Sequence, residues 1–464
     1  MKTVNKKINH SADISPTFCI LPWIHLSTRP NGHMRLCCTS NASSVGALND
    51  KKWGGEVGIL KQAEGLPANF NHTDLKTAWN SDYMKRIRKN MLSGKIPPSC
   101  SKCFKEEKQG YQSKRIWENR HWFKKLSVTK LLQDTKRDGT IPNKIYYMDL
   151  RFGTKCNLKC IMCSPHDSSL WVSDWNKLYP QIQNKSLKEL MVWSNKGKVH
   201  GASYNWYKNN QGFWNQLLEQ IPNMKQLYFA GGESTIIPEH YKLLETCVEK
   251  GYAKQIDLRY NSNGIELPEK LFKLWEKFRS VIFHFSLDSI YEQNNYIRFP
   301  SDFSVLEKQL RRLDETSDSV SVTIACAIQV LNIYYIPEFI KWKLACRFKK
   351  INAWPKSAGL IDTHFVYHPA HLNVKILPLE FKKEVVKKFE DFYLWLEKEF
   401  KSQSDFLKHP YGISRLKGMC QFMLSEDWSN RMPEFREYIL KMDKIRGLNF
   451  KETFPEMAKL LDNF

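Results

Sequence analysis

Three closely spaced cysteines constrain the fold of this chain more than any other feature of its sequence. They are Cys156, Cys160 and Cys163 of the segment CNLKCIMC, and their C-x3-C-x2-C spacing directly follows a strand-like stretch at residues 146–152. Thiolates are the usual ligands of iron–sulfur clusters, which normally take four of them. Three neighbouring cysteines therefore leave one iron of a four-iron cluster open to a ligand from solution, which favours chemistry over structural stapling.

A zinc site is the main alternative for these three cysteines. Structural zinc sites favour two separated pairs of ligands that together complete a tetrahedron. Here no fourth Cys or His lies close by in the sequence except His166. The spacing therefore favours a cluster, while zinc stays open as an alternative.

Length and composition indicate a folded protein of two or three units. The chain has 464 residues, of which 42% are hydrophobic and 13% aromatic, and this composition argues against disorder. The longest apolar stretch, residues 322–336, is too short to span a bilayer, and residues 1–15 lack the apolar core of a secretory signal. We therefore expect a cytoplasmic protein without a membrane segment.

The net charge of +23 raises the question of an anionic partner, such as RNA or an acidic peptide. Basic residues gather at residues 114–137 and 341–350, where they are interleaved with aromatic and aliphatic residues. This interleaving favours amphipathic helices whose lysines face solvent. An RNA partner stays open as the alternative.

Strand-like runs alternate with helical patterns through the middle of the chain. The alternation predicts βα units around a parallel sheet, open or barrel-like, with the chemistry at the carboxyl ends of the strands. The runs lie at residues 145–151, 226–230, 255–260, 281–287, 320–328 and 350–354.

The sequence also predicts three domains. Residues 1–140 form a cysteine-bearing region of loops and short helices, with one clear helix at residues 75–92. Residues 141–377 form the α/β core, which carries a helical insertion at residues 164–224. Residues 378–464 are helical and amphipathic.

Glycines and polar residues stand where three of the predicted strands end. Gly231, Gly232 and Glu233 follow the second strand, where glycines allow close backbone approach and a carboxylate can receive an ammonium group. The third strand ends near Asn261. These residues predict a ligand site at the strand ends.

The fourth predicted strand ends in Ser286 and Asp288, and Arg298 follows a dozen residues later. Alternate residues on a strand point the same way, so Ser286 and Asp288 would offer a hydroxyl and a carboxylate to one ligand. An arginine fork suits a carboxylate. Turn chemistry and a surface ion pair are the alternatives for these residues.

Together, the cysteine triad and the strand-end residues resemble the radical S-adenosylmethionine enzymes. The resemblance implies a partial (β/α)6 TIM-type barrel in which Cys156, Cys160 and Cys163 hold a [4Fe-4S] cluster. In that family the amino and carboxylate groups of S-adenosylmethionine chelate the open iron. The reduced cluster then passes an electron to the sulfonium, and the resulting 5'-deoxyadenosyl radical abstracts a substrate hydrogen.

The resemblance also implies which residues contact S-adenosylmethionine. The Gly231 to Glu233 motif would receive the amino group, Ser286 and Arg298 the carboxylate, and the strand end at Leu331 the adenine. Met162 stands where the family commonly has an aromatic residue, a departure that affects side-chain stacking on adenine rather than the backbone contact. The implied cofactor-binding residues are Met162, Gly231, Gly232, Glu233, Asn261, Ser286, Asp288, Arg298 and Leu331.

A second group of cysteines resembles the SPASM or shortened twitch module, which carries auxiliary clusters. Here the module precedes the core, as in radical enzymes with an N-terminal twitch domain. The resemblance implies that Cys19, Cys37, Cys100 and Cys103 ligate an auxiliary [4Fe-4S] cluster fully, with Cys38 as the alternative to Cys37. A zinc site made by the same thiolates is the competing interpretation.

The resulting expectation is a radical S-adenosylmethionine oxidoreductase that acts on a peptide or protein and receives electrons from a reductant such as flavodoxin or ferredoxin. A radical RNA-modifying enzyme is the first alternative, suggested by the net charge of +23. A zinc-stabilised basic binding protein is the second.

Overall fold

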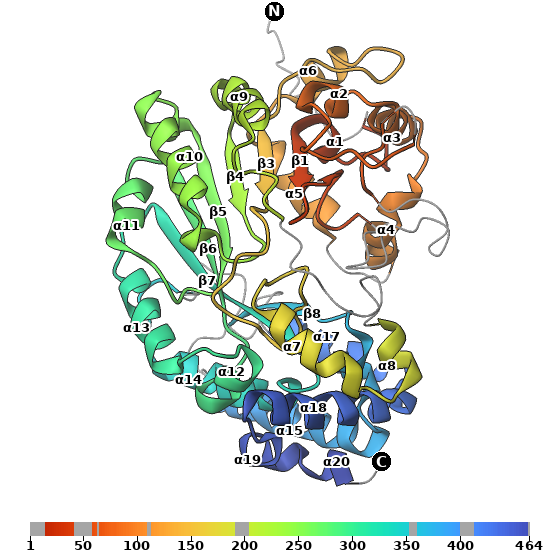
Figure 1. Ribbon diagram of the computed structural model, residues 1–464, viewed down its shortest axis with the longest axis vertical. Helices are drawn as coiled ribbons and strands as arrows, with labels where there is room; N and C mark the ends of the chain where they lie inside the picture. The colour runs from red at the N-terminus through yellow and green to blue at the C-terminus, as the bar shows by residue number, and fades with distance from the viewer. Residues whose placement is uncertain are drawn as a thin grey trace, which may run out of the picture. The chain divides into compact units, whose positions relative to one another are not determined.

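The computed structural model describes residues 14–40, 58–62, 65–108, 113–190, 204–351, 360–399 and 413–462. The protein is a mixed α/β protein with an eight-stranded sheet (Figure 1). Its described residues divide into two compact units, of which the first holds those up to Arg151 together with Asn205–Tyr228. The second unit holds Phe152–Tyr204 and the residues from Phe229 onward. Within the described parts of the chain, we find no helix whose length and hydropathy would suit a membrane span.

The first unit contributes four neighbouring strands in the order β2-β1-β3-β4. β1 runs antiparallel to β2 but parallel to β3, where Leu26 lies opposite Met148. Its strands are β1 (His25–Thr28), β2 (Met34–Arg35), β3 (Tyr147–Leu150) and β4 (Gln226–Phe229). Its helices are α1 (Leu21–Ile24), α2 (Leu75–Trp79), α3 (Asp82–Leu92), α4 (Ser101–Lys108), α5 (Lys114–Trp122), α6 (Val128–Gln133) and α9 (Gln211–Gln220).

The second unit contributes the strands in the order β5-β6-β7-β8, all parallel to one another. Figure 1 shows helices α10, α11 and α13 along one side of these strands. The strands are β5 (Asp257–Ser262), β6 (Ser280–Ser286), β7 (Val320–Ile328) and β8 (Asp362–Phe365). The helices are α7 (Trp171–Leu178), α8 (Lys185–Leu190), α10 (Pro238–Glu249), α11 (Glu269–Trp275), α12 (Tyr291–Ile297), α13 (Phe303–Asp314), α14 (Ile336–Ala345), α15 (Leu379–Glu399), α17 (Ile413–Leu424), α18 (Met432–Arg446), α19 (Phe450–Thr453) and α20 (Lys459–Asp462).

The central strands of the second unit have one apolar and one polar face. Tyr260 lies opposite Phe283 and Phe283 opposite Val322, so aromatic and β-branched side chains form a buried row on one face. The next residues along, Asn261 and His284, lie opposite each other on the other face because side chains alternate along a strand. The pairing register of these strands therefore decides which residues at the strand ends can face a ligand.

The structure corrects two details of the sequence-based secondary structure. The helix expected at residues 75–92 is two helices, α2 and α3, because Ser81 restarts the helix by accepting a hydrogen bond from the N–H of Met84. The strand expected at residues 350–354 is absent at its described residues, 350 and 351, and the remainder lies outside the described residues. The strand that pairs with β7 is instead β8.

One buried arginine fixes the helices of the first unit to its loops. The guanidinium of Arg88 donates to the carbonyls of Pro22, Trp79 and Gly139 and to the side-chain oxygen of Asn80, at 2.8–3.1 Å. The guanidinium also stacks over the Trp79 ring, 5.1 Å from its centroid. Burial lowers the pKa of Arg88 to about 9, so these hydrogen bonds are what keep the buried cation acceptable.

We predict that Arg88→Met destabilises the protein by about 3 kcal/mol or more, because three buried carbonyls and the half-buried Asn80 side chain lose a charged donor. Urea denaturation followed by circular dichroism measures the change. Lys89→Met is the matched control, since Lys89 is the next residue of the same helix and is exposed. Equal effects of the two substitutions would show that Arg88 does not have this role.

Candidate functional site

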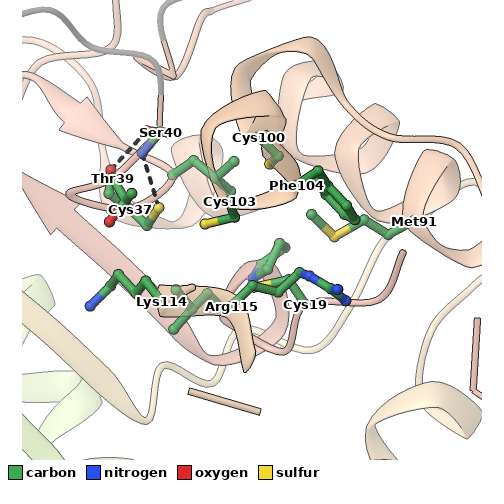
Figure 2. Close-up of a pocket in the computed structure, with 13 residues that line it drawn as sticks. Cys19, Cys37, Thr39, Ser40, Met91, Cys100, Cys103, Phe104, Lys114 and Arg115 are labelled. Atoms are coloured by element: carbon green, nitrogen blue, oxygen red, sulfur yellow. Dashed lines mark hydrogen bonds between the residues drawn. The ribbon is translucent and has the colours of Figure 1, made fainter. Parts of the chain in front are cut away.

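Four cysteine thiols line one pocket of the first unit, which we call the N-terminal cysteine pocket. Cys19 precedes α1 and Cys37 follows β2, while Cys100 ends a short turn of helix and Cys103 lies in α4. Figure 2 shows these side chains around the same space. The chain thus brings together four thiols from three segments that are distant in sequence.

The pocket keeps its thiols neutral unless a cation joins them. Burial raises the pKa of Cys19 well above its ordinary value, and the neighbouring Cys100 and Cys37 raise it further. Burial raises the pKa of Cys37 to about 12 in the same way. The four thiols lie close enough to repel one another as thiolates, so a group that binds them has to bring positive charge, as iron ions or zinc do.

No three Cys, His, Asp or Glu side chains in the described residues are arranged so that they could share one metal ion. A multi-iron cluster does not require side chains that share one metal ion, because each of its thiolates binds a different iron atom. The four thiols of the N-terminal cysteine pocket match the number of ligands that a closed [4Fe-4S] cluster takes. The donor set therefore fits such a cluster.

The walls of this pocket distinguish Cys37 from its neighbour Cys38. Cys37 lines the pocket and accepts a hydrogen bond from the N–H of Ser40 at 3.2 Å, whereas Cys38 is not among the lining residues. The Cys38 sulfur lies 3.8 Å from the Thr39 hydroxyl instead. Of the two candidate ligands named from the sequence, the pocket contains Cys37.

Two cations from α5 also line the N-terminal cysteine pocket. Arg115 donates to the carbonyl of Phe18 at 2.9 Å and pairs with Glu107 of α4, which joins α5 to two of the cysteine-bearing segments. Lys114 pairs with Glu118 at 2.8 Å. Positive charge at the wall suits a site that holds thiolates.

The second unit contains the three cysteines of the C-x3-C-x2-C motif in a single loop, residues 156–163, which we call the cysteine loop. The backbone N–H of Leu158 donates to the sulfur of Cys156 at 3.4 Å. The guanidinium of Arg298 lies 3.9 Å from the sulfur of Cys160. Such donors stabilise thiolates and are known to tune iron–sulfur clusters.

The thiols of the cysteine loop also lie within reach of one another. Cys160 and Cys163 are hydrogen-bonded, a contact that lowers the pKa of Cys160 and raises that of Cys163. Burial, together with the charges of Cys160 and Glu233, raises the pKa of Cys156 to about 12. As in the N-terminal cysteine pocket, bound positive charge would favour the thiolate forms.

Backbone hydrogen bonds hold the cysteine loop against the end of α12 and the residues just after it. The N–H of Lys159 donates to the carbonyl of Phe299 at 2.7 Å. The N–H of Ile161 donates to the carbonyl of Ile297 at 2.8 Å. The indole N–H of Trp171 donates to the carbonyl of Cys160 at 2.8 Å. These contacts fix the path of the loop and therefore the positions of its sulfurs.

Glu233 joins the end of β4 to the end of β5. Its carboxylate is buried and accepts hydrogen bonds from the Ser262 hydroxyl at 2.9 Å and from the N–H of Asn263 at 2.7 Å. It also accepts hydrogen bonds from the N–H and the hydroxyl of Thr235 at 3.2 and 3.0 Å. Burial raises the pKa of Glu233, while these bonds oppose that rise and favour the carboxylate.

Gly232 lies directly against Lys155, the residue that precedes the cysteine loop. Its φ of +54° is unfavourable for other residues, and a Cβ atom there would lie 2.4 Å from the Lys155 carbonyl oxygen. Beside it, the N–H of Glu233 donates to the same carbonyl at 2.8 Å. The glycine therefore permits the chain after β4 to approach Lys155 closely, while the ligand site expected at Gly231 and Gly232 stays a prediction.

Three of the other predicted residues lie around the carboxyl end of β6. Ser286 is half-buried there, while Asp288 is fully buried and accepts a hydrogen bond from the N–H of Ala327 at 2.7 Å. The Nε of Arg298 lies 2.9 Å from the Asp288 carboxylate, which raises the pKa of that guanidinium against the opposing effect of burial. Asp288 thus acts here as the anchor of Arg298.

The remaining predicted residues have different environments. Asn261 is exposed on the polar face of β5, and Met162 is half-buried in the cysteine loop. Leu331 follows β7 and is fully buried, so its side chain packs in the core. Only the backbone of Leu331 could therefore contact a ligand.

Sequence reasoning missed one residue that touches a cysteine. The amide of Asn263 donates to the Asn157 side chain at 2.7 Å and lies 3.9 Å from the sulfur of Cys156, so it links β5 to the cysteine loop. The sequence did place Asn263 near the site, since it follows the third predicted strand by only a few residues. Its contact with a residue more than one hundred positions away could not be read from that placement.

A comparison with known protein families supports the interpretation of the first unit. The family model of SPASM, an iron-sulfur cluster-binding domain, matches residues 19–104. The matched span begins at Cys19 and ends one residue after Cys103, so it includes all four cysteines of the N-terminal cysteine pocket. A search of the curated proteins found no match.

Solved structures show only distant similarity to this chain. A structure of anSMEcpe with bound AdoMet and the Cp18Cys peptide is 16% identical, with a TM-score of 0.32, and the match covers 54% of this chain and 59% of that one. A structure of SuiB from Streptococcus suis bound to its precursor peptide SuiA is 11% identical, with a TM-score of 0.33, and the match covers 72% and 66%. The chain spans roughly two thirds or less of the length of either structure.

We predict that Gly232→Ala destabilises the second unit more than Gly251→Ala does. Both positions have a positive φ, which costs about 1–2 kcal/mol for alanine, but nothing lies within 4 Å of a Cβ at Gly251. The clash with the Lys155 carbonyl should add about 1–3 kcal/mol at Gly232. Thermal unfolding of both variants measures the difference, and equal melting temperatures would contradict the close approach.

Proposed function

We propose that this protein is a radical S-adenosylmethionine enzyme with an auxiliary iron–sulfur cluster. The observation that carries the proposal is the cysteine loop, which gathers three thiols in one short segment. The Asn263 amide lies 3.9 Å from the Cys156 sulfur, and Lys155, the residue before the loop, lies against Gly232 and Glu233. A cluster bound there would supply an electron for reductive cleavage of S-adenosylmethionine to a radical that abstracts hydrogen. Three protein ligands would leave one iron for the cofactor.

In this proposal the surrounding residues bind and orient S-adenosylmethionine. One oxygen of Glu233 accepts a single hydrogen bond among the described contacts, from the N–H of Asn263, which leaves acceptor capacity for an ammonium group. Arg298 and Ser286 are the candidates for the carboxylate, as the resemblance implies. The Asp288 contact would hold the Arg298 fork in place for this task.

The N-terminal cysteine pocket would hold a closed auxiliary cluster. Its four thiols would occupy every iron, so the pocket suits electron transfer or structural support better than substrate binding. The SPASM match over residues 19–104 supports an iron–sulfur group in this region. A flavodoxin or ferredoxin would be the source of electrons.

We infer that the substrate is a peptide or protein side chain, because radical enzymes with auxiliary clusters often modify such substrates. RNA is the second candidate, and the net charge of +23 favours it. The two candidates differ in their response to salt. Contacts with phosphates release counterions, whereas a peptide contact of few charges does not.

We predict that Cys156→Ala abolishes the formation of 5'-deoxyadenosine after anaerobic reconstitution and lowers the iron content by about four per chain. Cys247→Ala is the matched control, because Cys247 is a buried cysteine of α10 that lies outside both sites. Its iron content and product yield should match those of the unchanged protein. Unimpaired 5'-deoxyadenosine formation in Cys156→Ala would contradict the assignment.

Metal analysis of the same anaerobic preparations separates the enzyme from a zinc-stabilised binding protein. Iron and sulfide in equal amounts, about eight of each per chain, with visible absorption, support clusters in both sites. Zinc without iron would favour the binding protein instead.

We predict that RNA, if it is the substrate, binds with an affinity that falls steeply with salt. A protein that neutralises several phosphates shows a slope of about −0.9 per contact in a plot of log K against log salt for duplexes and about −0.7 for single strands. Fluorescence anisotropy with labelled RNA at several salt concentrations measures this slope. A flat response, together with deuterium transfer from a labelled peptide into 5'-deoxyadenosine, would leave the peptide as the substrate.

A further inference from the structure

A buried cation from the C-terminal helices lies behind the cysteine loop. Arg446 is the last residue of α18, and its side chain is fully buried. Its Nε lies 2.8 Å from the carboxylate of Asp174 in α7, although the two residues are 272 positions apart in sequence. A fully buried guanidinium is costly unless its surroundings use the charge.

The carboxylate that Arg446 contacts is shared with the cysteine loop. The other oxygen of Asp174 accepts a hydrogen bond from the Nζ of Lys159 at 2.7 Å, and Lys159 lies between the first two cysteines. One buried carboxylate therefore faces two cations. Asp443, the acidic residue in the last turn of α18, instead accepts hydrogen bonds from the Tyr296 hydroxyl at 2.6 Å and the Phe450 N–H at 2.8 Å.

The aromatic rings around Arg446 also contact the cysteine loop. The guanidinium lies over the Trp171 ring at 4.4 Å, and the indole N–H of Trp171 donates to the carbonyl of Cys160. The Phe299 ring lies 5.3 Å away, and the carbonyl of Phe299 accepts the N–H of Lys159. Each of these neighbours of the Arg446 guanidinium therefore also holds the backbone of the loop.

The charge of Arg446 is only partly satisfied by these contacts. Both terminal nitrogens, Nη1 and Nη2, are buried and have no hydrogen-bond partner among the described residues. An ordinary structural arginine uses most of its donors, as Arg88 does in the first unit. The incomplete bonding points to a role for the charge itself.

We propose that Arg446 is a positioning residue that fixes the cysteine loop through Asp174 and Trp171, and that its charge stabilises the reduced state of the open cluster. The inference rests on the proposed function. If a cluster is bound by the three thiolates, reduction by a flavodoxin- or ferredoxin-type donor would add one electron to it. A buried cation favours that added negative charge because the local dielectric is low.

The test is a redox titration of the full-length protein after anaerobic reconstitution, followed by electron paramagnetic resonance. The signal that changes when S-adenosylmethionine is added identifies the open cluster. Arg446→Gln should shift its midpoint potential to more negative values, whereas Asp174→Asn should shift it to more positive values. A purely structural role would not produce shifts of opposite sign.

Two further variants serve as controls. Lys444→Gln removes the same charge from an exposed position in the last turn of α18 and should leave the potential unchanged. Arg446→Lys keeps the charge and should stay close to the unchanged protein, which keeps the test valid if Arg446→Gln does not fold. Shifts of the same sign in Arg446→Gln and Asp174→Asn, or no shift in either, would overturn the charge role.

Hydrogen exchange of the metal-free protein tests the positioning role without the cluster. The amides of residues 158–163 should exchange faster in Arg446→Gln than in Lys444→Gln, since only the former loses the contact with Asp174. Equal exchange rates would overturn the positioning role. A failure of the proposed function would instead show as the absence of any signal that responds to S-adenosylmethionine in the unchanged protein.

Discussion

The cost of bringing buried thiols together is the constraint on which both candidate sites depend. Each thiolate carries a charge that burial disfavours and that its neighbours repel, as the raised pKa values of Cys19, Cys37 and Cys156 show. The fold holds the thiols in place without disulfides, since these cysteines are free. Contacts elsewhere in each unit must therefore maintain an arrangement that becomes favourable only when positive charge is bound.

The two sites meet this constraint by different routes. The N-terminal cysteine pocket collects thiols from distant segments, so the helix contacts of Arg88 and Arg115 decide whether the thiols stay together. The cysteine loop takes its thiols from one segment, so spacing is set locally and distant contacts control the path of the loop. A pocket of the first kind depends on the packing of its whole unit, while a loop of the second kind depends on a few hydrogen bonds behind it.

The sequence was most informative where chemistry is encoded over short spacings. The thiols of the cysteine loop, Gly232 and Glu233 could be named because they occur in compact motifs, and five of the six predicted strands correspond to β3 through β7. The contacts of Arg446 and Tyr438 with α7 and the cysteine loop could not be predicted, because they join positions about 270 residues apart. The break between α2 and α3 was missed because the cap at Ser81 interrupts an apolar periodicity that continues through it.

The pair formed by Arg298 and Asp288 shows how one guanidinium could serve two purposes at the cysteine loop. Its Nε faces the buried Asp288 carboxylate at 2.9 Å, and its Nη1 lies 3.9 Å from the Cys160 sulfur. Arginine has five N–H donors in a rigid fork, so these contacts leave donors for a further carboxylate. Because Asp288 is itself fixed by the N–H of Ala327 in β7, the direction of the fork is set by the strand. A ligand bound by those donors would thereby be oriented by the sheet rather than by a flexible side chain.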